Sequence, residues 1–406
     1  MKLQAIIRFL KTSPVMVPVL AAVDFVLWII DRLAVLSVGS VSTRPNTLVV
    51  LKFDVMGDYV LFRNYLRYLK QQLPYANNAI TLCGNPAFRT IAETFDQDIV
   101  DQFIWVDIYK LTTRPLYRFK FVRQLRQQGF SIAFCPTHSR VLVLDDFMAK
   151  VTGAPVRVGC QGDRINIKPW EARYGDSCYT RLLPSQPGIL FESERNRQTL
   201  EAFLQQPVPT QQPRLPTANL SAVSLPKPYV VLSLGAGQPF RVWPAVRFAE
   251  VVNYLQRNYP DHRIVLTGAP GEELFANALL AQLTNFDGIE NLTARLSLLQ
   301  LIALLAEAEL LIANETGTVH LAAAVGTPTV VISQGKSLVR WHPYPATTAK
   351  EIQYLYPPEL EQHRADLSAV AERFNPESPL SIDEVSAERV INQLNSALQR
   401  RSRFVG

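Results

Sequence analysis

From Thr47 onward, the chain alternates short apolar runs with longer amphipathic stretches. The first series has three apolar runs separated by two helical patterns: 48–53, 79–84 and 131–136, with 59–72 and 117–128 between them. Continuous apolar runs of this length are typical of strands buried on both faces, as in parallel sheets that helices cover. The alternation therefore predicts a doubly wound α/β domain.

A second series of the same kind follows a polar, proline-rich stretch at 207–228. Its predicted strands are 229–235, 263–268, 310–314 and 328–333, and its predicted helices are 245–258, 272–283, 298–306 and 318–325. Because 406 residues exceed what one hydrophobic core usually serves, we predict two Rossmann-like domains. They cover 47–206 and 229–406, and 207–228 is the linker.

The N-terminal extension, residues 1–46, contains an apolar run at 14–30. Three basic residues precede this run: Lys2, Arg8 and Lys11. A secretory signal is disfavoured because no small-residue cleavage site follows the run. A spanning helix needs roughly 20 apolar residues, and this run is shorter and contains Asp24. Two alternatives stay open, a helix that contacts a membrane surface through residues 1–32 and a helix that packs on the protein.

Composition adds little to this outline. The four cysteines, Cys83, Cys135, Cys160 and Cys178, form no CxxC pair, so neither a zinc site nor a disulfide framework is predicted, and a reducing compartment fits best. The net charge of +6 is compatible with a phosphate-bearing ligand or with an anionic membrane surface.

The segment 310–332 is the strongest local signal. A predicted strand ends at Asn314, a short turn follows, and a helix of small residues runs to Gly326. The N-terminus of such a helix offers free N–H groups and a positive dipole end, which suit a phosphate. The side chains of Thr316, Thr318 and His320 could add donors. Alternatively, Thr316 only caps the helix and His320 packs beneath it.

Two further glycine-containing turns follow predicted strands of the second domain. The first is Gly235-Ala236-Gly237, followed by Arg241 and by Trp243-Pro244. It is not the GxGxxG dinucleotide fingerprint, because Phe240 occupies the position of the last glycine. The second turn contains Gly268 and is followed by Glu272 and Glu273; in the plain interpretation, Glu272 or Glu273 only caps the next helix.

In the first domain, the predicted strand at 48–53 leads into Asp54, Gly57 and Asp58. A carboxylate presented by a tight turn at a strand end can act as a general base. Alternatively, Asp58 only caps the helix that follows.

Three motifs follow one another in the chain: Met56-Gly57-Asp58, the block from Gly235 to Pro244, and Asn314-Glu315-Thr316-Gly317 with His320. Together they resemble glycosyltransferase family 9, the bacterial heptosyltransferases. The resemblance implies a GT-B fold, with two doubly wound Rossmann-like domains facing across a cleft and a closing helix at 385–399. It also implies that the turn at Gly268 lies near the nucleoside of the donor. It implies an inverting transferase with Asp58 as the general base. Asp54, at the strand end, is the second candidate; it would orient the acceptor or raise the pKa of the base. Glu315 stands where the family commonly has aspartate.

The implied donor-binding residues are Gly235, Ala236, Gly237, Arg241, Trp243, Gly268, Glu315, Thr316, Gly317, Thr318 and His320. Arg241 and the helix N-terminus would bind the diphosphate, so no metal cofactor is expected. Asp145-Asp146 is not a DxD metal motif and is interpreted as a solvated helix face. Four basic residues of the first domain could bind an anionic acceptor or form a solvated rim: Arg157, Arg164, Lys168 and Arg173.

The resemblance further implies that heptose or a related sugar moves from a nucleoside diphosphate, with an ADP-sugar favoured, to a lipopolysaccharide-like or other lipid-linked or oligosaccharide acceptor. The expected location is the cytoplasm, peripheral at the inner membrane, and no nucleic-acid partner is expected. One alternative is an inactive GT-B sugar-binding or assembly module. A dehydrogenase is disfavoured by the missing fingerprint.

Overall fold

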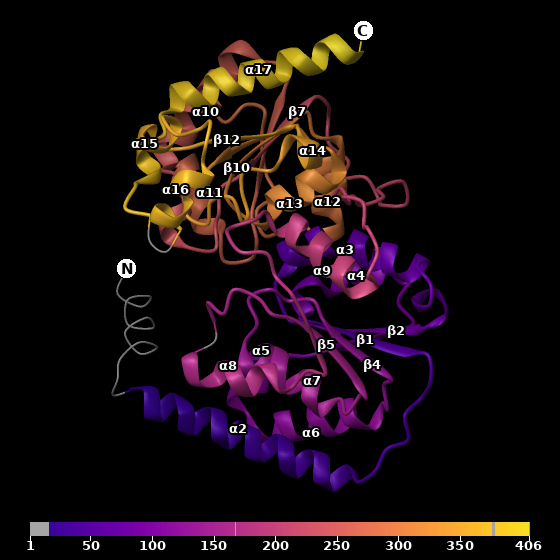
Figure 1. The fold of residues 1–406 in the computed structure, drawn as a ribbon. Coiled ribbons are helices and arrows are strands. Elements are labelled where there is room, and N and C mark those ends of the chain that lie inside the picture. Colours follow the sequence, from indigo (N-terminus) through magenta and orange to yellow (C-terminus); the bar gives the residue numbers. More distant parts are fainter. Residues whose placement is uncertain (1–15, 167, 376–377, 406) are drawn as a thin grey trace. The chain divides into compact units, whose positions relative to one another are not determined.

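The computed structural model describes residues 16–166, 168–375 and 378–405 (Figure 1). Internal contacts divide the chain into two compact units. The first unit comprises the chain up to Val55, Leu66–Pro187 and Asn196–Val208. The second comprises Met56–Tyr65, Gly188–Arg195 and the chain from Pro209 onward. Two short segments of the N-terminal half are therefore part of the second unit.

The first unit is built on a parallel six-stranded sheet in the order β3-β2-β1-β4-β5-β6. The strands are β1 (Thr47–Lys52), β2 (Ala79–Gly84), β3 (Gln102–Trp105), β4 (Ile132–Cys135), β5 (Val156–Cys160) and β6 (Arg181–Leu183). The predicted strands β1, β2 and β4 are confirmed. The sequence did not reveal the other three, because β3 and β6 are short, partly exposed edge strands and β5 contains Arg157 and Gly159.

Helices connect these strands (Figure 1). They are α3 (Met56–Gln71), α4 (Arg89–Phe95), α5 (Ile108–Thr113), α6 (Pro115–Gln127), the π-helical turn η3 (Leu142–Asp146), α7 (Phe147–Val151), α8 (Pro169–Asp176) and α9 (Glu192–Leu204). The predicted helices at 59–72 and 117–128 correspond to α3 and α6.

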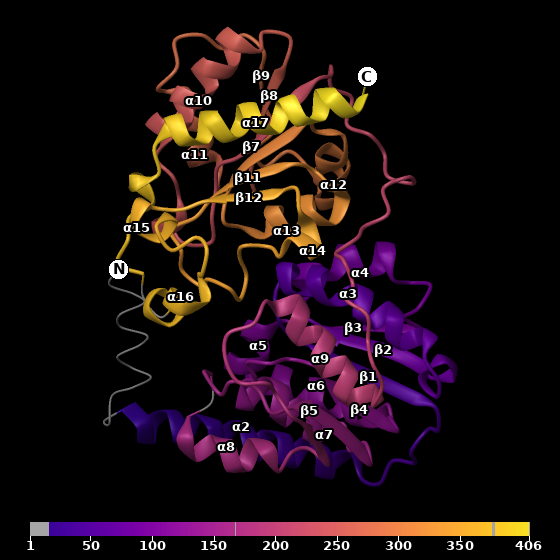
Figure 2. The same ribbon diagram turned by 45° about the horizontal axis from the view of Figure 1, so that its top comes forward.

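A long helix, α2 (Met16–Val38), precedes the first strand and packs against α6, α7 and η3 (Figures 1 and 2). Leu27 and Ala34 of α2 are buried on the side that faces the protein. Asp31 is buried as well and accepts two hydrogen bonds from Arg118 of α6, at 2.7 and 2.6 Å. The apolar run of the N-terminal extension therefore packs on the protein along one side. The basic residues at positions 2, 8 and 11 lie outside the described residues.

The second unit is built on another parallel six-stranded sheet, in the order β12-β11-β10-β7-β8-β9. Its strands are β7 (Tyr229–Ser233), β8 (Arg263–Thr267), β9 (Ile289–Asn291), β10 (Leu310–Asn314), β11 (Thr329–Ile332) and β12 (Ile352–Leu355). The four strands predicted for this half are confirmed as β7, β8, β10 and β11. The two missed strands, β9 and β12, are the edges of the sheet.

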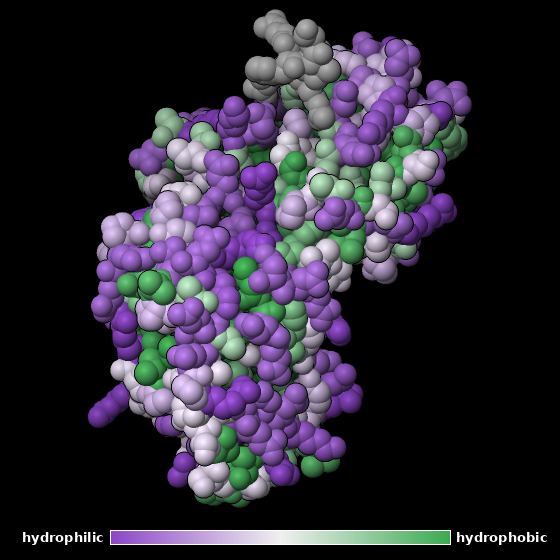
Figure 3. Space-filling view, turned by 90° about the vertical axis from the view of Figure 1, so that its right-hand side faces the viewer, coloured by the Kyte–Doolittle hydropathy of each residue, from purple (hydrophilic) through white to green (hydrophobic). Residues whose placement is uncertain are grey.

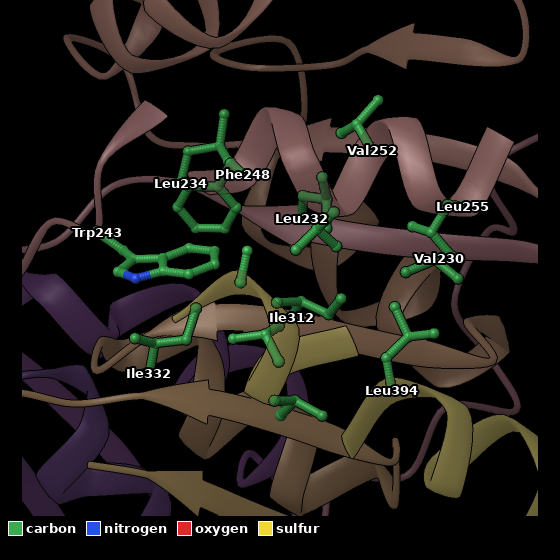
Figure 4. Packing of buried hydrophobic residues seen from close by; sticks show 14 of the residues in the cluster. Val230, Leu232, Leu234, Trp243, Phe248, Val252, Leu255, Ile312, Ile332 and Leu394 are labelled. Atoms are coloured by element: carbon green, nitrogen blue, oxygen red, sulfur yellow. The ribbon is translucent and has the colours of Figure 1, made fainter. Parts of the chain in front are cut away.

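The helices of the second unit are α10 (Ala245–Asn258), α11 (Glu273–Leu280), α12 (Leu298–Glu307), α13 (Gly317–Val325), α14 (Ala346–Ala349), α15 (Pro358–Glu361), α16 (Ser368–Phe374) and α17 (Ala387–Val405). α17 packs against α10 and over β10 and β11 (Figure 2). The core between the sheet and these helices contains Trp243, Phe248, Ile312 and Leu394 (Figure 4).

Both sheets reverse their strand order once, between β1 and β4 in the first unit and between β7 and β10 in the second. In doubly wound sheets, the loops at the carboxyl ends of the two strands that flank such a reversal form the ligand-binding crevice. The structure thus points to the loops after β7 and β10, and to those after β1 and β4.

Across the described residues, the structure contains no helix with both the length and the apolar character that crossing a membrane requires. On the face drawn in Figure 3, hydrophobic residues form small groups among hydrophilic ones. This mixture is usual for protein surfaces.

Candidate functional site

In the second unit, the loops after β7 and β10 are joined by an ion pair at the reversal of strand order. The loop after β7 contains a 3₁₀ turn, η4 (Pro239–Arg241), which ends at Arg241. Nη1 of Arg241 lies 3.3 Å from Oε1 of Glu315, the first residue after β10. The guanidinium Nε of Arg241 is buried and has no hydrogen-bond partner among the described residues. A buried donor without a partner costs free energy, and an anion bound here would satisfy it.

Glu315 is the anionic centre of this site and is almost fully buried. Its Oε2 accepts a hydrogen bond of 2.7 Å from the Ser333 hydroxyl and lies 3.1 Å from Nε2 of His342. Burial alone raises the pKa of a carboxyl group, but His342, Arg241 and Ser333 outweigh it and lower the pKa of Glu315 to about 2. Glu315 is therefore a charged residue that holds Arg241 and His342 in place.

His342 is completely buried and is oriented from both ring nitrogens. Its Nε2 lies 2.7 Å from the carbonyl oxygen of Lys336 and faces the Glu315 carboxylate, so this nitrogen carries a proton. Its Nδ1 lies 2.9 Å from the hydroxyl of Tyr356. Because it falls outside the motifs recognised in the sequence, His342 was not among the predicted site residues.

Asn314 and Trp243 anchor the loop after β7 by hydrogen bonds and core packing. The Asn314 amide donates to the carbonyl of Leu234 at 2.7 Å and accepts from the backbone N–H of Trp243 at 3.1 Å. The Trp243 indole is buried in the core, packs edge-on against Phe248 and donates to the carbonyl of Val385 at 2.8 Å (Figure 4). The structure therefore places the predicted donor-site residue Trp243 under the loop, where it supports Arg241.

The N-terminus of α13 follows Glu315 directly. Thr316 is the N-cap residue in extended conformation, and its side chain makes no capping hydrogen bond within the described residues. The alternative in which Thr316 only caps the helix is therefore not supported. The Val319 N–H donates to the carbonyl of Thr316 at 3.1 Å, and the N–H groups of Gly317 and Thr318 point out of the helix N-terminus, where Thr316, Gly317 and Thr318 are half-buried. The helix ends, as predicted, at Gly326, which has the left-handed φ of 78°.

His320 lies in the first turn of α13, with its Nδ1 2.6 Å from the hydroxyl of Tyr344. Burial lowers the pKa of His320 to about 4, so the imidazole is neutral at pH 7. The ring packs against Gly57, where a Cβ atom would come within 2.7 Å of the ring carbon Cδ2. Gly57 is thus required by the close approach of the imidazole.

The turn that carries Asp58 packs on α13 inside the second unit. Residues 56–65, the first part of α3, belong to this unit, and the methyl group of Met56 would meet a Cβ atom on Gly317 at 2.8 Å. Asp58 is half-buried in the first turn of α3, a position favourable for an acidic residue at a helix N-terminus. The structure therefore brings the Met-Gly-Asp turn and the Glu-Thr-Gly turn together.

The glycine turns after β7 and β8 lie side by side. The carboxylate of Glu272 occupies the space over Gly235, where a Cβ atom would come within 2.1 Å of the carboxylate carbon Cδ. The same carboxylate accepts a hydrogen bond of 2.8 Å from the backbone N–H of Ala269, next to Gly268. Ala236 is half-buried, while Gly237 is exposed with open space around it. Glu272 thus holds two loops together.

Lys336 is a cation that the sequence motifs did not reveal. It follows β11, and its Nζ lies 5.1 Å from the ring centroid of Phe240, while the Arg241 guanidinium lies 5.7 Å from the same ring. The loop around it contains Ser337 and Val339, both with φ of 67°. Such backbone conformations are rare for non-glycine residues, most of all for valine, and they concentrate at functional sites.

In the first unit, Asp54 lies at the reversal of strand order between β1 and β4. Its Oδ2 lies 2.6 Å from Nζ of the buried Lys52 and accepts a 3.2 Å hydrogen bond from Thr137, which follows β4. Asp54 is therefore an ion-paired carboxylate at the predicted ligand crevice of this sheet. Asp54 and Asp58 belong to different units.

The interpretation of Asp145-Asp146 as a solvated helix face is wrong. Both carboxylates are buried in η3, because each has donors that compensate its desolvation. Asp145 accepts from the backbone N–H of Val141 at 2.7 Å, and Asp146 accepts from Arg140 and Tyr179 at 2.6 and 2.9 Å. Burial, followed by the nearby charge of Asp54, raises the pKa of Asp145 to about 7.

The predicted basic group of the acceptor loops is largely engaged within the first unit. Arg157 donates to the carbonyl of Cys178, Arg164 pairs with Asp176, and Lys168 pairs with Glu171. Among the described residues, no cluster of three or more potential metal ligands of the His, Cys, Asp or Glu type occurs. The four cysteines are free and buried.

Known proteins resemble this chain over most of its length. The model of glycosyltransferase family 9 (heptosyltransferase) matches residues 118–365, more than half of the chain. Lipopolysaccharide heptosyltransferase 2 of Escherichia coli (strain K12) is 24% identical over 297 residues, 69% of this chain and 79% of the relative. Lipopolysaccharide heptosyltransferase 3 of Escherichia coli is 25% identical over 173 residues, 41% of this chain and half of the relative's length.

Among solved structures, E. coli heptosyltransferase WaaC with ADP matches with a TM-score of 0.65 at 18% identity. The match covers 86% of this chain and 99% of that chain. At this identity the likeness establishes the fold, which is of the GT-B type with two Rossmann-like domains.

Proposed function

The chain belongs to glycosyltransferase family 9, and from this membership we propose that it is an active inverting glycosyltransferase. The observation that carries the proposal is the cationic site at the N-terminus of α13. There the buried Nε of Arg241 lacks a partner, Lys336 approaches Phe240, and the first turn of the helix has no side-chain cap among the described residues.

This site suits the leaving group of the reaction. When a sugar leaves a nucleoside diphosphate, negative charge develops on the diphosphate, and fixed donors that await it lower the barrier. Arg241 offers a fork of donors, Lys336 adds a second charge, and the α13 N-terminus adds backbone N–H groups. We propose that these groups meet the charge that a metal ion would otherwise neutralise. Glu315 positions Arg241 and His342 and does not contact the donor.

We propose ADP as the nucleotide and heptose or a related sugar as the transferred group. The support comes from the relatives, which are named as heptosyltransferases, and from the matched WaaC structure, which holds ADP. We place the nucleoside beside the loops that Glu272 ties together, next to Gly237, where a Cβ atom would meet none of the described residues within 4 Å.

We propose Asp58 as the general base that takes the proton from the acceptor hydroxyl. Asp58 is carried by the turn that packs on α13, so it belongs to the same unit as the diphosphate site. Asp54 is assigned to acceptor orientation, because its carboxylate is already held by Lys52 and Thr137. The acceptor would be a lipid-linked, lipopolysaccharide-like glycan, and the reaction would take place at a membrane surface.

The test is isothermal titration of the protein with ADP, UDP and GDP. We expect ADP to bind in the micromolar range and Arg241→Ala to weaken binding at least about tenfold, since a charged donor pair is lost. Arg247→Ala serves as matched control, because Arg247 is also an ion-paired arginine of this unit but lies on α10. Absence of binding for all three nucleotides would instead favour a catalytically inactive module.

A further inference from the structure

The helix α2 has an apolar side that the other described residues leave uncovered. Seven of its large hydrophobic residues are at least 36% exposed: Val19, Val23, Phe25, Val26, Ile29, Leu33 and Leu36. Most of them recur at spacings of three or four residues, so they form one stripe along the helix. Monomeric proteins seldom expose a continuous apolar stripe of this length, and such surfaces mark interaction sites.

The charges of α2 are distributed to leave this stripe uncharged except for one cation. Of its three charged residues, only Arg32 is exposed. Asp31 is buried against Arg118, and Asp24 lies 3.3 Å from Nζ of Lys168. Both carboxylates are thus neutralised on the side of α2 that faces the protein.

The start of α6, the helix against which α2 packs, adds further cations and another exposed apolar residue. A hollow of about 440 Å³ is lined there by Lys110, Arg114, Leu116 and Lys120, among others. Leu116 is 78% exposed. Arg114 and Lys120 make no ion pair among the described residues, and α6 contains no acidic residue. Arg114 lies one turn before Arg118, whose guanidinium binds α2, whereas Leu116 and Lys120 project from the solvent side of α6.

A second hollow continues the apolar character on the other flank of α2. It measures about 330 Å³, and half of its lining residues are aromatic: Phe25 and Trp28 of α2, Phe147 of α7 and Tyr174 of α8. The lining also contains Asp24 and Glu171, both of which pair with Lys168. The rings of Phe25 and Trp28 stack at a centroid distance of 5.7 Å. Aromatic residues beside exposed aliphatic ones are characteristic of helices that lie at the level of lipid headgroups.

We propose that this surface, the α2 stripe together with Arg32, Arg114, Leu116 and Lys120, docks on an anionic lipid bilayer with α2 in the plane of the interface. The stripe enters the boundary of the acyl chains, and the cations bind lipid phosphates. The 15 residues before α2 fit this occupant, because their sequence holds three basic residues and no acidic one. The inference rests on the proposed function, which places the reaction at a membrane; it adds the face that binds.

The experiment is co-sedimentation of the full chain with vesicles. Vesicles of phosphatidylethanolamine and phosphatidylglycerol are compared with vesicles of phosphatidylcholine, for wild type, for Val26→Ser/Leu33→Ser and for Arg114→Glu/Lys120→Glu. All four positions are exposed, so the fold is expected to persist, and circular dichroism checks it. The control Val246→Ser/Leu274→Ser replaces residues of the second unit with similar exposures of 52% and 60%, against 51% and 54% for Val26 and Leu33.

We expect wild type and control to bind the anionic vesicles alike and the α2 variant to bind at least about tenfold more weakly. The charge-reversed variant should lose binding to anionic vesicles but bind phosphatidylcholine as the wild type does. Equal binding of the α2 variant and the control would overturn the proposal, as would a wild type that binds neither vesicle. A dimer by sedimentation velocity that only the α2 variant dissolves would assign the stripe to a second copy instead. ADP titration of every variant keeps the outcomes separate, because loss of ADP binding bears on the proposed function alone.

Discussion

Nη1 of Arg241 and Oε1 of Glu315 lie 3.3 Å apart, and this ion pair connects the loops after β7 and β10 at the point where the strand order of the second sheet reverses. Because Glu315 also holds His342 and Ser333, one carboxylate determines where three donors of the loops stand. Glutamate in this position therefore has a structural explanation: its carboxylate reaches partners on both the β7 and the β11 sides.

Replacing Glu315 by glutamine should destabilise the second unit in a pH-dependent way. The folded state lowers the pKa of Glu315 from 4.5 to about 2, so its contribution is present above pH 4.5 and is lost as the pH falls towards 2. At pH 7 we expect Glu315→Gln to lower the free energy of unfolding by roughly 3 kcal/mol, as when a buried ion pair loses a partner. Urea unfolding at several pH values measures this. The surface variant Glu250→Gln should change the free energy of unfolding little at any pH. An equal loss of stability in both variants would contradict the role assigned to Glu315.

His320 should make stability increase with pH in mildly acidic solution. Its folded pKa is about 4, below the ordinary value of 6.5, so between these values the unfolded chain binds a proton that the folded chain does not. The free energy of unfolding should therefore rise from pH 4 to 6.5, by on the order of 2 kcal/mol from this group. His320→Gln should flatten the rise, whereas His363→Gln, at an exposed position, should leave it. Unchanged slopes in both variants would show that the imidazole is not desolvated.

Asp58→Asn should separate catalysis from donor binding. Loss of a general base typically lowers kcat by about 10²- to 10⁴-fold. Since the diphosphate site is left intact, we expect the Kd for ADP to stay within about twofold. Turnover with an ADP-sugar donor and ADP titration give the two values. Asp98→Asn, a surface carboxylate paired with Arg67, is the control. A kcat that stays at the wild-type value in Asp58→Asn would reassign the base.

Lys336→Met should weaken ADP binding about tenfold, because the methionine keeps the stem of the side chain and removes the charge near Phe240. Lys350→Met, an exposed lysine of the same unit, should leave the affinity as it is. Calorimetry at low and high salt provides the comparison, and the difference between wild type and Lys336→Met should shrink at high salt. Identical affinities of the two variants would remove Lys336 from the site.

Asp31→Asn should loosen α2 from the first unit. Its partner Arg118 is buried, so removing the carboxylate leaves an uncompensated guanidinium, at a cost of about 3 kcal/mol. Hydrogen exchange of the α2 amides should accelerate strongly in this variant. Arg32→Met, which alters an exposed charge on the same helix, should exchange as the wild type does; acceleration in both would mean that α2 is held by something other than this pair.

The sequence determined the fold class and the order of the elements, because long apolar runs between amphipathic helices leave few arrangements other than parallel sheets. It also indicated the Asn314 to Gly326 turn and helix, since strand end, glycine and proline are local signals. The edge strands β3, β6 and β9 were not predicted because short, partly exposed strands contain no long apolar run, and the buried edge strand β12 was missed because it has only four residues.

Only the tertiary structure decided which charged groups stand together. Lys336 and His342 join Glu315 and Arg241 because parallel strands bring their carboxyl ends to one edge of the sheet, although the residues lie far apart in sequence. In the same way, it buried Asp145 and Asp146, which the sequence pattern places on a solvated face, because Arg140, Tyr179 and the Val141 N–H compensate them. Local patterns encode secondary structure, whereas the pairing of buried charges depends on contacts between distant segments, which no short stretch of sequence contains.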